Sequence, residues 1–136
     1  MKTDKQALGK WGEQRAAEFL KRRGYEIIER NARTKYGEID LVVSHSESDF
    51  SASDFASEEH KPVIVFVEVK TRSSMSFGYP EQAIDARKQE HMLSAALAYL
   101  QEHPQLGDDW RIDVIAIQRL PASPPEIVHF ENVLTN

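Results

Sequence analysis

The sequence predicts an α/β domain with a mixed central β-sheet flanked by helices, its elements in the order α-β-β-β-α-β-β. Three observations predict this. Apolar residues recur at helical spacing over the first 23 residues, and an apolar run at 63–71 is typical of a buried strand. A long helical pattern then separates that run from the next strand, which indicates a parallel, right-handed crossover. With 136 residues, the chain is expected to form a single domain over 1–136.

The first helix is expected to begin at Thr3 or Asp4, either of which can cap it, and to end near Arg23, before Gly24. Its apolar stripe comprises Leu8, Trp11, Ala16, Phe19 and Leu20. A first strand is predicted at 25–31, a polar turn at 31–36 and a second strand at 37–44. Gly9 and Gly12 indicate that the helix approaches the sheet or a ligand closely.

Residues 45–60 are rich in Ser, Asp and Glu and predict a mobile acidic hairpin loop rather than a linker between domains. The strand at 63–71 is apolar on both faces, so we expect it at the centre of the sheet. Pro80 is a favoured residue at a helix start and predicts a long helix that ends before Pro104. The last two strands are expected at 110–118 and 127–134.

Composition excludes several classes of protein. The chain has no cysteine, so disulfides and thiolate zinc sites are absent. No stretch approaches the roughly 20 apolar residues of a membrane span, and a cytoplasmic location is the default expectation. The net charge of −5 is unevenly distributed: 45–60 holds five acidic residues and no Lys or Arg, whereas the first 36 residues hold ten basic against five acidic ones. That basic part is compatible with phosphate binding.

Two neighbouring strands carry charges within apolar runs. Glu68 and Lys70 share a strand face because side chains alternate along a strand, and Asp40 interrupts the preceding strand. Buried charges need partners, a metal ion or an open cleft. Two carboxylates on adjacent strands favour Mg²⁺ or Mn²⁺, which would activate water, with the Val69 carbonyl as a further ligand. Lys70 would stabilise charge that develops at phosphorus.

Simpler interpretations exist for each of these residues. Glu68 and Lys70 could merely form an ion pair at a solvent-facing strand end. Glu13, at the margin of the apolar stripe of the first helix, could complete or orient a metal shell, or could pair with a nearby base. Glu38 could act through water or lie on the surface. The candidate phosphate contacts, each of which could instead be a solvated surface charge, are Arg33, Lys35, Arg72, Arg87 and Lys88.

Five segments together resemble a known family. They are Gly9-Lys10-Trp11-Gly12-Glu13, Gly37-Glu38-Ile39-Asp40-Leu41, Phe66-Val67-Glu68-Val69-Lys70-Thr71-Arg72, Phe77-Gly78 and Ala86-Arg87-Lys88-Gln89. The chain resembles the YraN-like family of predicted endonucleases, which is similar to archaeal Holliday-junction resolvases within the PD-(D/E)xK superfamily. The resemblance covers about residues 8–117, apart from 45–60. It implies a restriction-endonuclease-like sheet.

The resemblance also implies roles for particular residues. Asp40 and Glu68 would be metal ligands, Lys70 the catalytic lysine, and Glu13 the acid that the resolvase branch carries on its first helix. Ile39 stands where the superfamily has proline, a difference expected to affect turn geometry more than chemistry.

The leading hypothesis is a Mg²⁺- or Mn²⁺-dependent DNA endonuclease that acts on branched or structured DNA in repair or recombination. Cleavage of two strands would require a two-fold homodimer. The alternative is a non-catalytic module that binds nucleic acid or a protein on the same scaffold.

Overall fold

The computed structural model describes residues 4–46, 62–73 and 85–134. Within these residues, one five-stranded sheet has the strand order β1-β2-β3-β4-β5. The elements are α1 (Asp4–Arg22), β1 (Glu26–Thr34), β2 (Gly37–His45), β3 (Val63–Arg72), α2 (Ala86–Glu102), the short 3₁₀ helix η3 (Pro104–Leu106), β4 (Trp110–Gln118) and β5 (Glu126–Phe130). The predicted order α-β-β-β-α-β-β is therefore confirmed.

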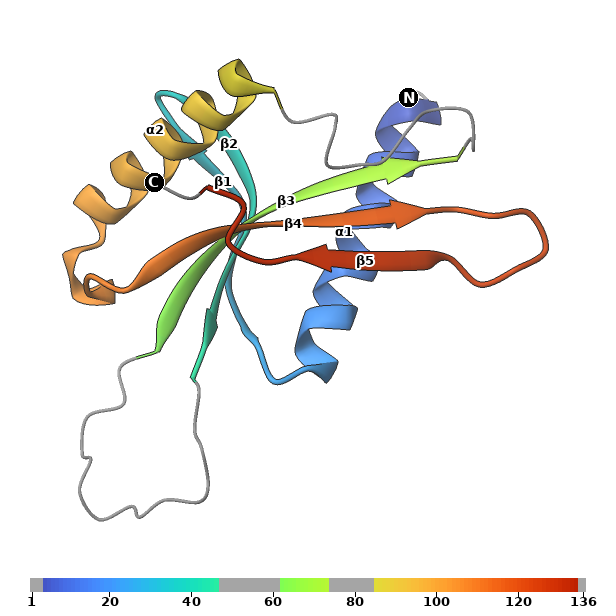
Figure 1. Ribbon diagram of the computed structural model, residues 1–136, viewed down its shortest axis with the longest axis horizontal. Coiled ribbons are helices and arrows are strands. Elements are labelled where there is room, and N and C mark those ends of the chain that lie inside the picture. The colour runs from blue at the N-terminus through green and yellow to red at the C-terminus, as the bar shows by residue number, and fades with distance from the viewer. Residues whose placement is uncertain (1–3, 47–61, 74–84, 135–136) are drawn as a thin grey trace, which may run out of the picture.

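The sheet is mixed, as expected. β3 pairs with β4 in parallel, and the other neighbouring pairs are antiparallel. The two helices lie on opposite faces of the twisted sheet (Figure 1). Leu41, Val65 and Ile115 contribute to the core under α1, whereas Phe66 and Ile112 contribute to the core under α2. β3 lies in the middle of the sheet, because an apolar strand is best buried when both of its faces are covered.

The C-terminus of α1 is fixed by local backbone hydrogen bonds. Gly24 adopts a φ of +90°, which favours glycine, directly after the last turn. The N–H of Gly24 donates to the Lys21 carbonyl over 3.1 Å, and the N–H of Tyr25 donates to the Leu20 carbonyl over 3.0 Å. This pair of bonds is a Schellman motif, and Leu20 and Tyr25 both enter the core under α1. The predicted stop at Gly24 is confirmed.

Gly12 determines how closely α1 approaches the sheet. A Cβ atom added at Gly12 would overlap Thr71 Oγ1 and would lie 2.9 Å from Thr71 Cβ. The expected close approach is thus confirmed at Gly12, while the same position at Gly9 has no neighbour within 4 Å. This contact places the first half of α1, and with it Glu13, over the C-terminal half of β3.

Three predicted boundaries were wrong. β1 continues to Thr34 instead of turning at Asn31, because 32–34 pair with 37–39 and Asn31 takes a φ of 51° within the strand. α2 begins at Ala86 rather than at Pro80: Asp85 is extended, and its side chain caps the helix by accepting the Lys88 N–H.

β5 ends at Phe130 rather than at 134. The chain then crosses β4, where the N–H of Val133 donates to the Ile112 carbonyl over 2.8 Å.

Other expectations fall on undescribed residues. The predicted loop at 45–60 lies there except for its first two positions, and so does the Phe77-Gly78 segment of the family resemblance. In the part of the chain that the structure describes, neither α-helix is both long and apolar enough to cross a membrane.

Candidate metal and phosphate site

Asp40 lies where β2 and β3 stop pairing. The ladder between the two strands ends at Leu41 and Val67, a register that would place Asp40 opposite Glu68. Beyond this point a side chain takes the place of the backbone hydrogen bonds between the two strands: Oδ2 of Asp40 accepts the N–H of Val69 over 2.8 Å. The N–H and C=O of one strand residue point to the same neighbour, so the Val69 carbonyl also faces this opening.

The carboxyl of Asp40 is electrostatically strained. Burial, followed by the charge of Glu68, raises its pKa from 3.8 to about 7. The hydrogen bond from Val69 opposes this change, and the charges of Glu13 and Glu38 add to it. These acids raise one another's pKa by mutual repulsion, and a divalent cation bound among them would relieve that repulsion.

Glu68 forms ion pairs with two lysines. Its Oε2 lies 3.6 Å from Nζ of Lys70 on the same strand and 3.3 Å from Nζ of Lys88 on α2. Only 12% of the Glu68 side chain is exposed. The shared face of Glu68 and Lys70 is therefore confirmed, and the ion pair of the simpler interpretation is also present. Both lysines are placed to contact an anion that approaches Glu68.

Glu13 reaches the same neighbourhood from the other side of the sheet. Its Oε1 accepts from Nδ2 of Asn31 over 3.1 Å, and the same amide donates to Glu38 over 3.3 Å. Asn31 therefore bridges two of the acids that raise the pKa of Asp40. Sequence patterns did not indicate this role, because an asparagine before a basic segment is typical of a turn.

The oxygen atoms at this point suit Mg²⁺ or Mn²⁺. Asp40, Glu68 and the Val69 carbonyl supply hard oxygen donors, and Mg²⁺ often uses only one or two protein carboxylates beside substrate phosphate and water. Residues 4–46, 62–73 and 85–134 contain no group of three or more His, Asp or Glu side chains that could hold a metal ion. The donor set therefore fits a site that substrate completes, rather than a protein cage.

The predicted phosphate contacts are dispersed. Arg33 is exposed on β1 and lies 3.9 Å from Glu38, and Nζ of Lys35 lies 5.3 Å from the ring centre of Tyr36. Arg87 is exposed in the first turn of α2. Arg72 lies at the end of β3, where its carbonyl accepts from Arg119.

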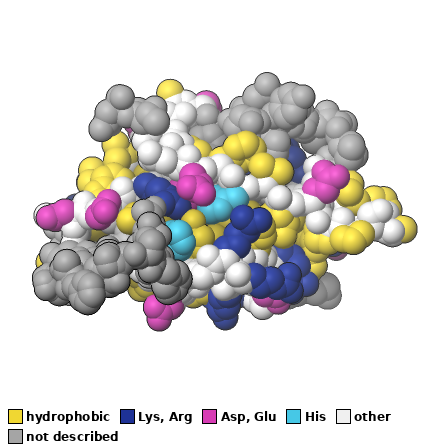
Figure 2. All heavy atoms as spheres, turned by 60° about the horizontal axis from the view of Figure 1, so that its bottom comes forward, with side chains coloured by type: hydrophobic (Ala, Val, Ile, Leu, Met, Phe, Trp, Pro, Cys, Tyr) yellow, Lys and Arg dark blue, Asp and Glu magenta, His cyan; other side chains and the backbone are white. Residues whose placement is uncertain are grey.

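An open groove of about 620 Å³ runs beside α1 and is lined by Gln6, Gly9, Lys10, Glu13, Asn31, Arg33 and Glu38. The groove brings Arg33 together with Lys10, which was not among the predicted contacts. Charges are mixed on the face shown in Figure 2, where basic side chains gather in one part and single acidic side chains surround them.

Asp113 belongs to a separate, structural network. It is fully buried on β4 and accepts from Nε of Arg111 over 3.0 Å. His129 Nε2 lies 2.7 Å from Oδ2, and the Asn132 N–H donates over 2.9 Å. Burial alone would raise the pKa of Asp113, but these hydrogen bonds outweigh it and hold the pKa below 3.8.

The described residues thus form an α/β protein whose mixed sheet presents carboxylates and lysines where two central strands separate. The chain belongs to the family described as "Uncharacterised protein family UPF0102", which matches residues 12–117. That span includes Glu13, Asp40, Glu68 and Lys70.

Several relatives carry the name UPF0102 protein. One from Syntrophotalea carbinolica is 41% identical over 91% of this chain and 88% of its own length. One from Syntrophomonas wolfei is 42% identical over 81% of this chain and 83% of its own length. A third, from Beutenbergia cavernae, is 36% identical over 95% and 97%, respectively.

Proposed function

We propose that this protein is a metal-dependent DNA endonuclease of the restriction-endonuclease-like superfamily. The observation that carries the proposal is that Asp40 lies at the end of the β2–β3 ladder next in register to Glu68, where burial and the neighbouring acids raise the pKa of Asp40 to about 7. Like charges directly opposite on adjacent strands destabilise a sheet. Such strain is typical of functional sites, where a ligand relieves it.

The residues have distinct roles in this proposal. Asp40, Glu68 and the Val69 carbonyl hold Mg²⁺ or Mn²⁺, and Glu13 completes or orients the site from α1. The bound ion would polarise the phosphate and lower the pKa of the attacking water. Lys70, 3.6 Å from Glu68, stabilises negative charge that develops on the phosphate oxygens.

DNA would enter along the groove beside α1. Lys10 and Arg33 line this groove, and Arg33 is 88% exposed, so both can follow a phosphate backbone. Glu38 lines this groove and also a cavity beside α2 that Glu68 lines as well. Lys88 contributes a cation from the α2 side. Branched or structured DNA in repair or recombination is the proposed substrate, with a homodimer for cleavage of two strands.

Cleavage of branched, duplex and single-stranded DNA in Mg²⁺, Mn²⁺ or chelator tests the proposal. Asp40→Asn and Glu68→Gln should abolish cleavage, and Lys70→Met should reduce it roughly 10²- to 10³-fold. Glu126→Gln, an exposed acid on β5, is the matched control and should cleave like the wild type. Cleavage that persists in all three site variants, or in chelator, would overturn the proposal.

The rival function is a non-catalytic module that binds nucleic acid or protein. One observation favours it: Lys70 and Lys88 both form ion pairs with Glu68. A module of this kind would bind equally well in chelator and in Mn²⁺. It would show the steep salt dependence of phosphate contacts if its partner is nucleic acid, and a weaker dependence if the partner is a protein.

A further inference from the structure

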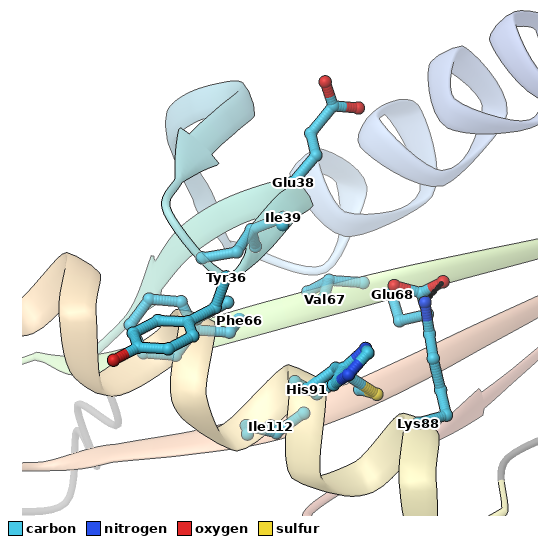
Figure 3. Close-up of a pocket in the computed structure, with 12 residues that line it drawn as sticks. Tyr36, Glu38, Ile39, Phe66, Val67, Glu68, Lys88, His91 and Ile112 are labelled. Carbon is cyan, nitrogen blue, oxygen red and sulfur yellow. Dashed lines mark ion pairs between the residues drawn. The ribbon is translucent and has the colours of Figure 1, made fainter.

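A cavity of about 120 Å³ lies between α2 and strands β2, β3 and β4, directly beside Glu68 (Figure 3). It is larger than one water needs and smaller than the roughly 300–1,000 Å³ of sites for drug-sized ligands. A single planar ring system matches this size class, whereas a whole nucleotide does not. The cavity shares Glu38, Glu68 and Lys88 with the candidate metal and phosphate site, and its other lining residues have no role in that site.

The lining separates into an apolar floor and a polar end. The floor is made of aliphatic, thioether and aromatic groups, namely Ile39, Phe66, Val67, Met92, Ala95 and Ile112. At the other end Glu68 and Lys88 face each other, and His91 points toward the space between them and the floor (Figure 3). An aromatic heterocycle needs this combination: apolar contact for its faces and hydrogen-bonding groups for one edge.

Tyr36 lines the cavity together with Phe66, at the end away from Glu68 and Lys88 (Figure 3). It sits in the tight turn between β1 and β2, where its N–H donates to Thr34 Oγ1 over 3.0 Å, and 49% of the residue is exposed. A large aromatic side chain left this exposed gains little for the fold. Stacking on a base is a use that such a ring commonly has in proteins that bind single strands.

We infer that this cavity receives one unstacked nucleobase, from the nucleotide next to the phosphate held at Asp40 and Glu68. The inference rests on the proposed function and narrows its substrate class. Glu68 belongs to both the cavity and the metal site, so a base in the cavity is attached to a sugar beside the reacting phosphate. A paired base in intact duplex cannot reach the floor, so the substrate carries an unpaired nucleotide at the cleavage point.

Binding in chelator tests the inference without cleavage. A single-stranded oligonucleotide that contains 2-aminopurine should change its fluorescence on binding. The same strand with abasic residues should bind at least about five-fold more weakly, as expected when base stacking is lost. Tyr36→Ala should weaken binding of the normal strand by a similar factor and leave abasic binding unchanged, while Tyr36→Phe keeps the ring and the affinity. Leu97→Ala, an equally exposed apolar residue on α2, is the control and should have no effect.

The two proposals can fail separately. Equal affinity for normal and abasic strands, no detectable single-strand binding, or an unaffected Tyr36→Ala variant would overturn the base cavity even if the protein cleaves DNA in Mn²⁺. Base-dependent binding that is lost in Tyr36→Ala would support the base cavity even if no cleavage is found. The missing cleavage would then contradict the proposed nuclease activity alone.

Discussion

Replacing the proposed metal ligand Asp40 by Asn should stabilise the metal-free protein at neutral and alkaline pH. Asn has nearly the same shape and can still accept the N–H of Val69, but it carries no charge to oppose Glu68. The pKa of Asp40 is about 7 in the folded protein and 3.8 in the unfolded chain, so deprotonation favours unfolding. The stability associated with the protonated carboxyl is complete below about pH 3.8 and is lost as the pH rises through about 7.

The size of the effect follows from the two pKa values. Their difference corresponds to at most about 4 kcal/mol. The side chain is partly exposed, and the neighbouring acids titrate together with it, so we expect about 1–3 kcal/mol at pH 8. Below about pH 4 the two proteins should be equally stable, because Asp40 is then protonated in both states.

Urea denaturation at about pH 4 and pH 8 measures this difference. Adding Mn²⁺ should reverse the order at pH 8, since only the wild-type protein gains stability from the ion. Glu126→Gln should change little under any of these conditions. If Asp40→Asn is less stable than the wild type at pH 8, Asp40 is a structural carboxylate and the reasoning fails.

Three further predictions concern Gly12, the buried Asp113 and Lys88. Gly12→Ala should lower the free energy of unfolding by about 1–3 kcal/mol, measured by urea denaturation, because the new methyl group would overlap Thr71. Adding Thr71→Gly to this variant should recover part of the loss. If it does not, the overlap with Thr71 is not the cause. Asp113→Ala should lower the free energy of unfolding by about 3–5 kcal/mol near neutral pH, because it removes the buried carboxylate shared by Arg111, the His129 ring and the Asn132 N–H. The wild-type contribution should disappear only as the pH falls below about 3.8, because the folded pKa is lowered; a loss that begins above pH 6 would contradict this. Lys88→Met should tighten Mn²⁺ binding about two- to five-fold by calorimetry, because Lys88 competes for Glu68; weaker binding would count against that competition.

The sequence was sufficient where a local signal and the tertiary structure agree. Gly24 ends α1 because it alone in that segment adopts the required positive φ without strain. The alternation of side chains placed Glu68 and Lys70 on one face, and two acids in apolar strands indicated that they would lie near each other. These predictions rest on strand and helix periodicity, which is visible in one dimension.

What the sequence could not supply depends on contacts between distant segments. Asparagine is a residue type that is common in turns, yet pairing with β2 keeps Asn31 in a strand. There its side chain bridges Glu13 and Glu38. The start of α2 at Ala86 rather than Pro80 depends on capping by Asp85, which competes with a second plausible helix start. The cavity beside Glu68 combines residues from four elements, so no single stretch of sequence could have indicated it.

A crystal structure of the protein grown with Mn²⁺ would show directly whether Asp40 and Glu68 share a metal ion, because Mn²⁺ can be located by its anomalous scattering. We expect one ion bound by carboxylate oxygens of both Asp40 and Glu68, at metal–oxygen distances of about 2.0–2.3 Å. Nζ of Lys88 should have moved away from Glu68. A structure at saturating Mn²⁺ in which neither carboxylate binds an ion, and in which Lys70 and Lys88 still pair with Glu68, would contradict a shared metal site.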